Sequence, residues 1–465
     1  MEFKVEIPAA FKERIELEMG REECAHLLAA LDGDTPTSIR LNPYKIAARP
    51  EGMEGIGWSK YGFYLEERPQ FTYDSAFHAG TYYVQEASSQ FVGHILATAS
   101  EELEGAKILD TCAAPGGKTT IYSTIVGMEG LVVAGEINRS RAQVLADNVR
   151  KWGLGNVVVV NGDAEHVSQF ESFYDVVAVD APCSGEGMFR RMEGAREEWA
   201  KSGGASYVAQ CAERQSDILS SAWRALKPGG ILIYSTCTFN RSENEELVAA
   251  FEQSVEGEVA EFDDVAVDDA WGVVKGCVGS FQTFRFMPHR SRGEGFFAAV
   301  ARKSFDAGGR QHVPKSKKSM LQSISRNDFA ECCRWVEQPE RMSFSMVGEN
   351  IYGYFTAQLD SVRKLADTLN VIYSGVTMGQ IFKGALSPDE ALALFVGLNR
   401  EAVACAVLND RDEMLSYLRK GDVPAERFEQ GMNLVVDCNG YGVGFAKRIG
   451  ARVNNRYPNS LRILK

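Results

Sequence analysis

The sequence lacks the features of membrane, secreted and zinc-binding proteins. It has no run of about 18 apolar residues, and its first residues, MEFKVEIPAAFKER, contain no apolar signal core. Ten cysteines are present, but no two form a CxxC pair, so we expect no metal site. These absences predict a cytoplasmic protein with no membrane partner, in which most cysteines are reduced core thiols.

An overall positive charge is also missing. The formal net charge of −13 argues against a surface that coats nucleic acid over its whole area. Basic residues are nevertheless concentrated in one place: residues 440–465 contain six of them and no acidic residue. Either a local basic binding surface or a solvated basic tail would explain this run.

Two phosphate-binding motifs are absent from the stretch LDTCAAPGGKTT at residues 109–120. A P-loop would need glycine where Cys112 stands, and the dinucleotide motif GxGxxG does not occur. What remains is a predicted strand at 107–111, a turn of small residues and a helix that begins near Thr119. Such a corner lets a ligand approach the backbone. Without a cradle of basic side chains, it suits a nucleoside cofactor that carries no phosphates.

The length of 465 residues predicts two to four domains. Between residues 107 and 302 strands and helices alternate, which is typical of an α/β fold with a mostly parallel sheet. Expected strands lie at 107–111, 131–136, 156–161, 174–180 and 230–235, expected helices at 139–152, 207–226 and 243–253, and two late strands at 282–286 and 296–300.

The flanking regions differ from this pattern. Helical spacing of apolar residues followed by a strand predicts a small N-terminal α/β unit, and a polar, basic stretch predicts a linker. Residues after the linker are expected to fold separately. The expected division is 1–90 (small α/β unit that packs on the next domain), 91–302 (α/β domain), 303–326 (linker), 327–401 (type unclear) and 402–465 (β-rich module).

Carboxylates stand at or just after three of the expected parallel strands. Ligands of open parallel sheets bind at the carboxyl ends of the strands. Glu136 lies nineteen residues after Gly117, an offset that suits a carboxylate bound to ribose hydroxyls. Asp163 can contact an adenine edge, and Asp180 ends the fourth strand. A single strand-end carboxylate is commonly only a helix cap, but three beside one small-residue turn favour a cofactor site.

Two cysteines occupy the same edge of the expected sheet. Cys183 follows the fourth strand in DAPCSGEGMFRR, and Cys237 ends the fifth in YSTCTF. Neighbouring strands are about 4.8 Å apart, so both thiols can face one pocket. A free thiol has a pKa near 8.5, so either cysteine needs a nearby cation or dipole to act as a nucleophile.

LDTCAAPGGKTT, DAPCSGEGMFR and LKPGGILIYSTCTFNRSENE resemble the three signature motifs of the Nol/Nop/Sun family of RNA cytosine-C5 methyltransferases, and PHRSRGEGFFAAV resembles its closing segment. The resemblance implies a Rossmann-like methyltransferase fold and S-adenosylmethionine as cofactor. It implies that Cys237 is the nucleophile, that Cys183 assists product release, and that Asp180 contacts the cytosine. The cofactor-binding residues it implies are Cys112, Ala113, Ala114, Pro115, Gly116, Gly117, Lys118, Glu136, Asp163 and Asp180.

The flanks resemble, more loosely, the bacterial RsmF-like branch, which modifies small-subunit (16S) ribosomal RNA and ends in a PUA-like RNA-binding domain. We therefore expect ribosomal RNA or the small subunit as partner, and a monomer. A transfer-RNA cytosine-C5 methyltransferase is the alternative. Two other classes are disfavoured: a DNA cytosine methyltransferase would place its only nucleophile after Pro-Cys, and a non-catalytic assembly factor would not need Cys237 and the cofactor turn, which are both intact.

Overall fold

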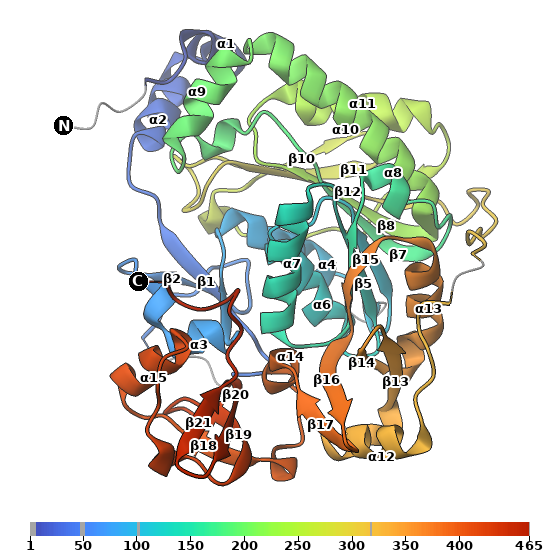
Figure 1. Ribbon diagram of the computed structural model, residues 1–465. Coiled ribbons are helices and arrows are strands. Elements are labelled where there is room, and N and C mark those ends of the chain that lie inside the picture. The colour runs from blue at the N-terminus through green and yellow to red at the C-terminus, as the bar shows by residue number, and fades with distance from the viewer. Residues whose placement is uncertain (1–5, 47–51, 100–102, 317–318, 465) are drawn as a thin grey trace.

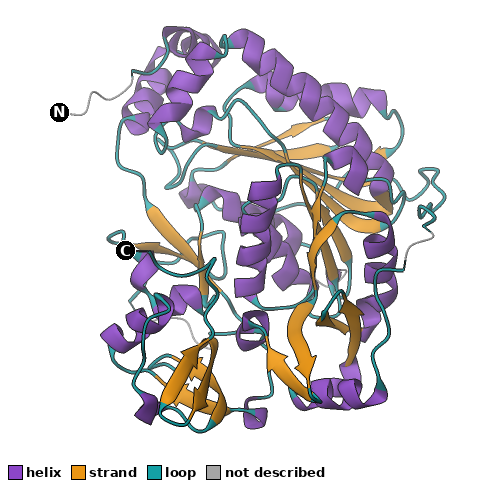
Figure 2. Ribbon diagram, in the orientation of Figure 1, coloured by secondary structure: helices purple, strands orange, loops and turns teal. Residues whose placement is uncertain are grey.

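The computed structural model describes residues 6–46, 52–99, 103–316 and 319–464 (Figure 1). A large mixed sheet lies at its centre with helices on both faces, and three smaller sheets lie around it (Figure 2). Within the described residues, no helix combines the length and the apolar character that crossing a membrane requires.

The central sheet contains five parallel strands in the order β8-β7-β4-β5-β6. Chain order reverses between β4 and β7, as in doubly wound α/β folds, so a crevice is expected at the carboxyl ends of these strands. The parallel strands are β4 (Lys107–Asp110), β5 (Leu131–Glu136), β6 (Val157–Asn161), β7 (Tyr174–Asp180) and β8 (Leu226–Thr236). Antiparallel strands extend both edges: β9 (Val259–Ala260), β10 (Val274–Val278), β11 (Phe281–Phe286) and β12 (Phe296–Lys303) on one side, and β15 (Val371–Ser374) on the other.

Two apolar cores cover the two faces of this sheet. Consecutive strand residues alternate between them: Val132 packs into one core and Leu131 into the other. The first core includes residues of α4 (Phe91–Ala97), α6 (Gly117–Val126) and α7 (Arg139–Trp152). The second includes residues of α8 (Ala164–Val167), α10 (Ala205–Ala225), α11 (Glu245–Ser254) and α13 (Leu359–Thr368). Since both faces are covered, the middle of each parallel strand is apolar, and the polar residues lie mainly toward the strand ends.

The N-terminal segment has two parts, a helical pair and a small sheet. Helices α1 (Ala9–Met19) and α2 (Arg21–Leu31) share an apolar cluster with Phe189 and Trp199 of the catalytic domain, near α9 (Glu193–Lys201). The following strands form a separate antiparallel sheet. These strands are β1 (Thr37–Leu41), β2 (Gly62–Leu65) and β3 (Tyr82–Val84), with the short helix α3 (Ser75–His78) between the last two.

Residues after the expected linker do not all fold apart from the catalytic domain. Strand β15 pairs with β6 and α13 packs on the sheet, because Val362 and Leu365 complete the second core. The expected linker also begins within β12, which ends at Lys303. The remaining elements of this region are α12 (Arg326–Arg334), β13 (Met342–Val347), β14 (Asn350–Phe355), β16 (Val376–Phe382), β17 (Ala385–Pro388) and α14 (Glu390–Leu394).

The C-terminal unit is a small mixed sheet with one helix. Its elements are β18 (Ala404–Val407), α15 (Arg411–Leu418), β19 (Gly431–Val436), β20 (Gly442–Ile449) and β21 (Arg452–Asn455). It lies beside the N-terminal α3 (red and blue in Figure 1), where His78 Nδ1 is 3.0 Å from Tyr457 Oη. The predicted β-rich module is thus confirmed.

Several predicted elements have the observed bounds, including strands 131–136 and 174–180 and helix 139–152. Others shift by a few residues. The helix after the cofactor turn begins at Gly117 rather than Thr119, and β8 begins at Leu226. Strand β10 was not expected, since its residues are mostly exposed and carry no apolar alternation.

Candidate active site

A cavity of about 440 Å³ opens at the carboxyl ends of the parallel strands. It lies beside the point where the strand order reverses, where doubly wound folds bind their ligands. Its size is that of a small-molecule site. We call it the catalytic cavity. It is lined by Thr111, Cys112, Ala114, Glu136, Ile137, Arg141, Gly162, Asp163, Ala164, Glu165, Asp180, Ala181, Pro182, Cys183, Arg214, Asp217, Ile218, Ser221 and Cys237.

Seven of the predicted site residues line this cavity: Cys112, Ala114, Glu136, Asp163, Asp180, Cys183 and Cys237. The rest of the turn, namely Ala113, Pro115, Gly116, Gly117 and Lys118, is not part of the lining. These residues fix the shape of the turn instead. The Ala113 amide donates to Gly135 O at 2.8 Å, and Gly116 precedes α6 with a φ of 110°, which favours glycine.

Glu136 is buried at the end of β5. One carboxylate oxygen accepts the Asn138 amide at 2.9 Å, and the other lies 3.4 Å from an Arg141 nitrogen. The carboxylate therefore has a fixed direction, with capacity left to accept hydroxyl groups. Asp163 differs: it is exposed, and its side chain caps α8 by accepting the His166 amide at 2.7 Å. It serves as a cap while it lines the cavity.

Asp180 is held at the cavity wall by two donors. Lys118 Nζ lies 2.8 Å from one carboxylate oxygen, and Ser235 Oγ donates to the other at 2.9 Å. Burial lowers the pKa of Lys118, but Asp180 outweighs it and the pKa is raised overall; the Cys237 thiolate also contributes to this rise. Lys118 is therefore a permanent cation that stabilises negative charge on both partners.

The two thiols are in contact. Cys183 Sγ and Cys237 Sγ are 3.4 Å apart, and both cysteines are free. The hydrogen bond to Cys237, together with burial, raises the pKa of Cys183 well above its usual range. Cys183 therefore keeps its proton at neutral pH and is able to donate it to Cys237 Sγ, although either sulfur can be the donor of this contact.

A clamp that the sequence did not reveal holds both cysteine-bearing loops. Glu243, in the 3₁₀ turn Arg241–Glu243, accepts the Ser184 amide at 2.9 Å and the Gln215 amide group at 2.9 Å. Asn244 accepts from Thr236 Oγ1 at 2.7 Å and donates to Thr238 O at 3.0 Å. One feature of the sequence pointed to Glu243 and Asn244: both lie in the motif that follows Cys237.

Other lining residues come from α10. Arg214, Asp217, Ile218 and Ser221 recur at helical spacing and face the cavity. This periodicity could have identified them, although it does not distinguish a cavity-facing stripe from a core-facing one. Across the described part of the chain, no three His, Cys, Asp or Glu side chains are grouped as a metal site would require. The expected absence of a metal remains a prediction.

The residues fit the cofactor expected from the sequence. The cavity offers a fixed buried carboxylate at Glu136, a small-residue wall and an exposed apolar side chain at Ile137, which suit a nucleoside. Five of the lining residues are acidic and two are basic, a balance that favours a positively charged ligand such as a sulfonium.

Fold and cavity define a Rossmann-like methyltransferase. Two solved structures from Pyrococcus horikoshii share the fold: a methyltransferase homolog protein (24% identity, 64% of this chain and 96% of that chain, TM-score 0.51) and NSun6 with SFG (20% identity, 64% and 98%, TM-score 0.51). The predicted α/β methyltransferase architecture is confirmed, and S-adenosylmethionine is the cofactor of this class.

The chain belongs to the RsmB/F family of 16S rRNA methyltransferases. The family model of that description matches residues 95–302, a model of the N-terminal domain of 16S rRNA methyltransferase RsmF matches 7–87, and a model of the methyltransferase RsmF PUA domain matches 407–463. Two similar curated proteins are both called ribosomal RNA small subunit methyltransferase F. One, from Pectobacterium atrosepticum, is 30% identical over 93% of this chain and 91% of its own; the other, from Vibrio campbellii, is 28% identical over 98% of each.

Proposed function

We propose that this protein transfers a methyl group from S-adenosylmethionine to carbon 5 of a cytosine in small-subunit ribosomal RNA. The observation that carries the proposal is the thiol pair: Cys183 and Cys237 are in contact inside the cavity that fits the cofactor. Family membership supports the RNA substrate, since the similar proteins are named for the ribosomal small subunit.

The thiol pair answers a specific chemical difficulty. Carbon 5 of cytosine is a poor nucleophile until a thiolate adds at carbon 6. We assign Cys237 to this sulfur–carbon bond, because Lys118 can stabilise negative charge on its sulfur and Cys183 can donate a hydrogen bond to it. The electron pair then makes carbon 5 enamine-like. S-adenosylmethionine supplies the electrophilic methyl group.

After methyl transfer a base must take the proton from carbon 5; the C–H electron pair then re-forms the double bond between carbons 5 and 6, and the sulfur–carbon bond breaks with its electron pair returning to Cys237 sulfur. Cys183 is the cysteine assigned to this release step, since it lies beside Cys237 on the separate loop that Glu243 clamps. Asp180 contributes by holding the cytosine ring in position. Its carboxylate lines the cavity and can accept a hydrogen bond from the cytosine amino group. The base must leave any stack to enter, which costs a few kcal/mol.

The substrate RNA is tested by methylating purified small-subunit ribosomal RNA, intact small subunits and transfer RNA in parallel with labelled cofactor. Bisulfite sequencing of the product then locates the modified base. We expect one 5-methylcytosine in the small-subunit RNA. A methylated transfer RNA with unmodified ribosomal RNA would favour the alternative substrate, and label in neither would favour a non-catalytic assembly factor. The expected monomeric state remains a prediction.

A further inference from the structure

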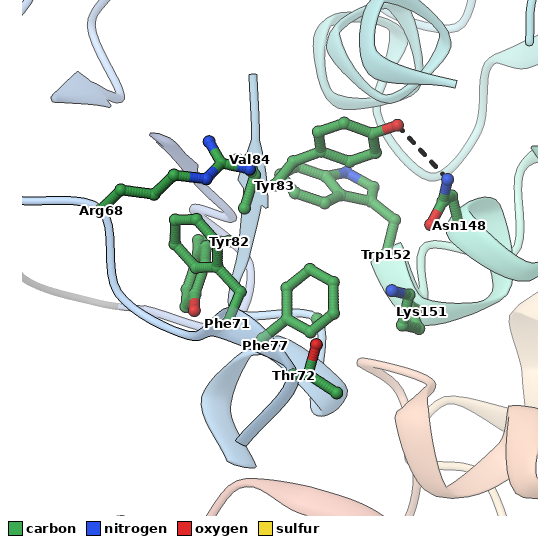
Figure 3. Close-up of a pocket in the computed structure, with 11 residues that line it drawn as sticks. Arg68, Phe71, Thr72, Phe77, Tyr82, Tyr83, Val84, Asn148, Lys151 and Trp152 are labelled. Carbon is green, nitrogen blue, oxygen red and sulfur yellow. Dashed lines mark hydrogen bonds between the residues drawn. The ribbon is translucent and has the colours of Figure 1, made fainter. Parts of the chain in front are cut away.

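A second cavity, of about 320 Å³, lies between the N-terminal segment and α7 (Figure 3). We call it the aromatic pocket. Its aromatic residues come from β3, α7, the 3₁₀ turn Phe71–Tyr73 and α3. It is lined by Arg68, Phe71, Thr72, Phe77, Gly80, Tyr82, Tyr83, Val84, Asn148, Lys151 and Trp152.

Three of the rings form one wall. The ring centres of Phe71, Phe77 and Tyr82 are 6.0–6.3 Å from one another, and the three rings gather together in Figure 3. Trp152 belongs to α7 and is fixed from outside the pocket, since the Arg40 guanidinium lies 4.4 Å from its ring centre. Rings held in place in this way offer flat faces on which a planar group can stack.

Two cations lie at these rings. The Arg68 guanidinium carbon is 5.5 Å from the centre of the Phe71 ring, and Lys151 Nζ is 4.0 Å from that of Phe77. Among the described residues, neither cation forms an ion pair with a carboxylate, and no acidic residue is part of the lining. The pocket therefore favours a ligand that is planar and aromatic at one end and anionic at the other.

The position of the pocket connects it to both functional parts of the chain. Asn148 Nδ2 donates to Pro115 O at 2.8 Å and Tyr83 Oη donates to the same carbonyl at 3.2 Å, so two lining residues hold the cofactor turn. Next to Phe77, His78 contacts Tyr457 of the C-terminal unit. A strand of RNA that reaches both the catalytic cavity and the C-terminal unit can pass the aromatic pocket.

We propose that the aromatic pocket binds one unstacked nucleotide of the substrate RNA, apart from the target cytosine, with its base on the rings and its phosphate at Arg68 and Lys151. This inference rests on the proposed function, because it assumes an RNA substrate. Single-stranded RNA is commonly recognised by bases that stack on aromatic side chains while cations contact the backbone.

The test compares two aromatic–cation pairs. The pocket variant is Arg68→Gln with Phe71→Ala. The control is Lys383→Gln with Phe382→Ala, an exposed pair at 5.4 Å that lines none of the described cavities. Affinity for purified small-subunit ribosomal RNA is measured by filter binding at one salt concentration, and affinity for S-adenosylmethionine by calorimetry. Thermal melting confirms that each variant folds.

We expect the pocket variant to bind RNA about 5- to 100-fold more weakly, as the loss of one stacked base predicts, while its cofactor affinity and the control are unchanged. Lys151→Gln removes charge without removing a ring; it should weaken RNA binding several-fold and carries the test where Phe71→Ala fails to fold. Equal RNA affinity in all variants would overturn the pocket but leave the proposed function standing. If the wild type binds no RNA, both fall.

A free nucleotide is the other ligand that combines a planar base with a phosphate and could occupy the aromatic pocket. Adenosine monophosphate is therefore titrated into the wild type and the pocket variant. Competition between this nucleotide and RNA, lost in the variant, supports the proposal. Saturable nucleotide binding that is lost in the variant while RNA affinity stays at the wild-type value would overturn it.

Discussion

Five carboxylates and two guanidinium groups are among the residues that line the catalytic cavity, whereas five aromatic rings and two cations are among those that line the aromatic pocket. Both cavities touch the turn at residues 112–118: Ala114 lines the first, and Pro115 O accepts hydrogen bonds from two residues of the second. The first suits a cationic cofactor and the second an anionic nucleotide. The two proposals together assign methyl transfer to the first cavity and an additional RNA contact to the second, and the predictions below test that division.

The largest expected effect is on the chemistry alone. Cys237→Ala should lower methylation at least about a thousandfold, because it removes the proposed nucleophile, while RNA and cofactor affinities stay near the wild-type values. Incorporation of tritiated methyl groups measures the rate. Cys277→Ala, an exposed cysteine on β10, is the matched control and should be fully active. Substantial activity without Cys237 would contradict the claim that this cysteine carries the chemistry of the catalytic cavity.

A second effect is expected at Asp110, which is buried at the end of β4 next to the cavity-lining Thr111. Burial raises the pKa of Asp110 to about 7, although Thr119 Oγ1 donates to it at 2.7 Å. The folded state thus holds a proton that the unfolded chain, with a pKa near 3.8, releases. Stability from this source is full below pH about 4 and is lost as pH rises through about 7.

Asp110→Asn should therefore flatten the pH dependence of the free energy of unfolding, by at most about 4 kcal/mol between those limits. The substitution keeps an oxygen that can accept from Thr119. Denaturant unfolding at several pH values measures the change. Parallel curves for wild type and variant would show that Asp110 is not the group responsible.

Cofactor binding should depend on Glu136 and not on Glu165, which is exposed. Glu136→Ala removes a charge-assisted hydrogen bond worth about 1.5–3 kcal/mol, so S-adenosylmethionine should bind about 10- to 150-fold more weakly. Glu165→Ala changes an exposed carboxylate of the same cavity and should have little effect. Calorimetry with both variants decides the matter: unchanged affinity in Glu136→Ala would remove this residue from the ribose site.

The smallest effect is expected at the C-terminal unit. Lys447 and Arg452 are exposed on β20 and β21, far in sequence from the cavity. Replacing both with Gln should reduce the slope of log affinity for RNA against log salt by about 1.5, since each phosphate contact contributes about 0.7–0.9. Cofactor affinity should not change. An equal slope in the double variant, with Lys201→Gln as control, would place the phosphate contacts elsewhere.

The sequence alone predicted the parallel sheet and the residues around its carboxyl ends. Runs such as Val157–Val160 are apolar throughout, because both faces of the strand are covered, and that pattern identifies a buried parallel strand without further context. Once the strands were assigned, the rule for ligand position in such sheets brought Glu136, Asp180 and Cys237 to one cavity.

Features made by tertiary packing could not be predicted in this way. The residues Val371–Ser374 alone do not predict that this strand pairs with β6, more than two hundred residues earlier. The pairing depends on the free edge that β6 presents once the parallel sheet has formed. The aromatic pocket has the same origin. Tyr83 lies on β3 and Trp152 on α7, and only the packing of these two elements against each other places both residues at one cavity.

The central claim, that Cys237 forms a covalent bond with RNA and Cys183 releases it, is tested most directly by adduct trapping. Each single variant and the double variant are incubated with small-subunit RNA and cofactor, then run on a denaturing gel. Cys183→Ala should accumulate a protein–RNA species, and Cys237→Ala and the double variant should show none. An adduct with Cys237→Ala but not with Cys183→Ala would exchange the two roles, and no adduct in any variant that binds RNA normally would contradict covalent catalysis.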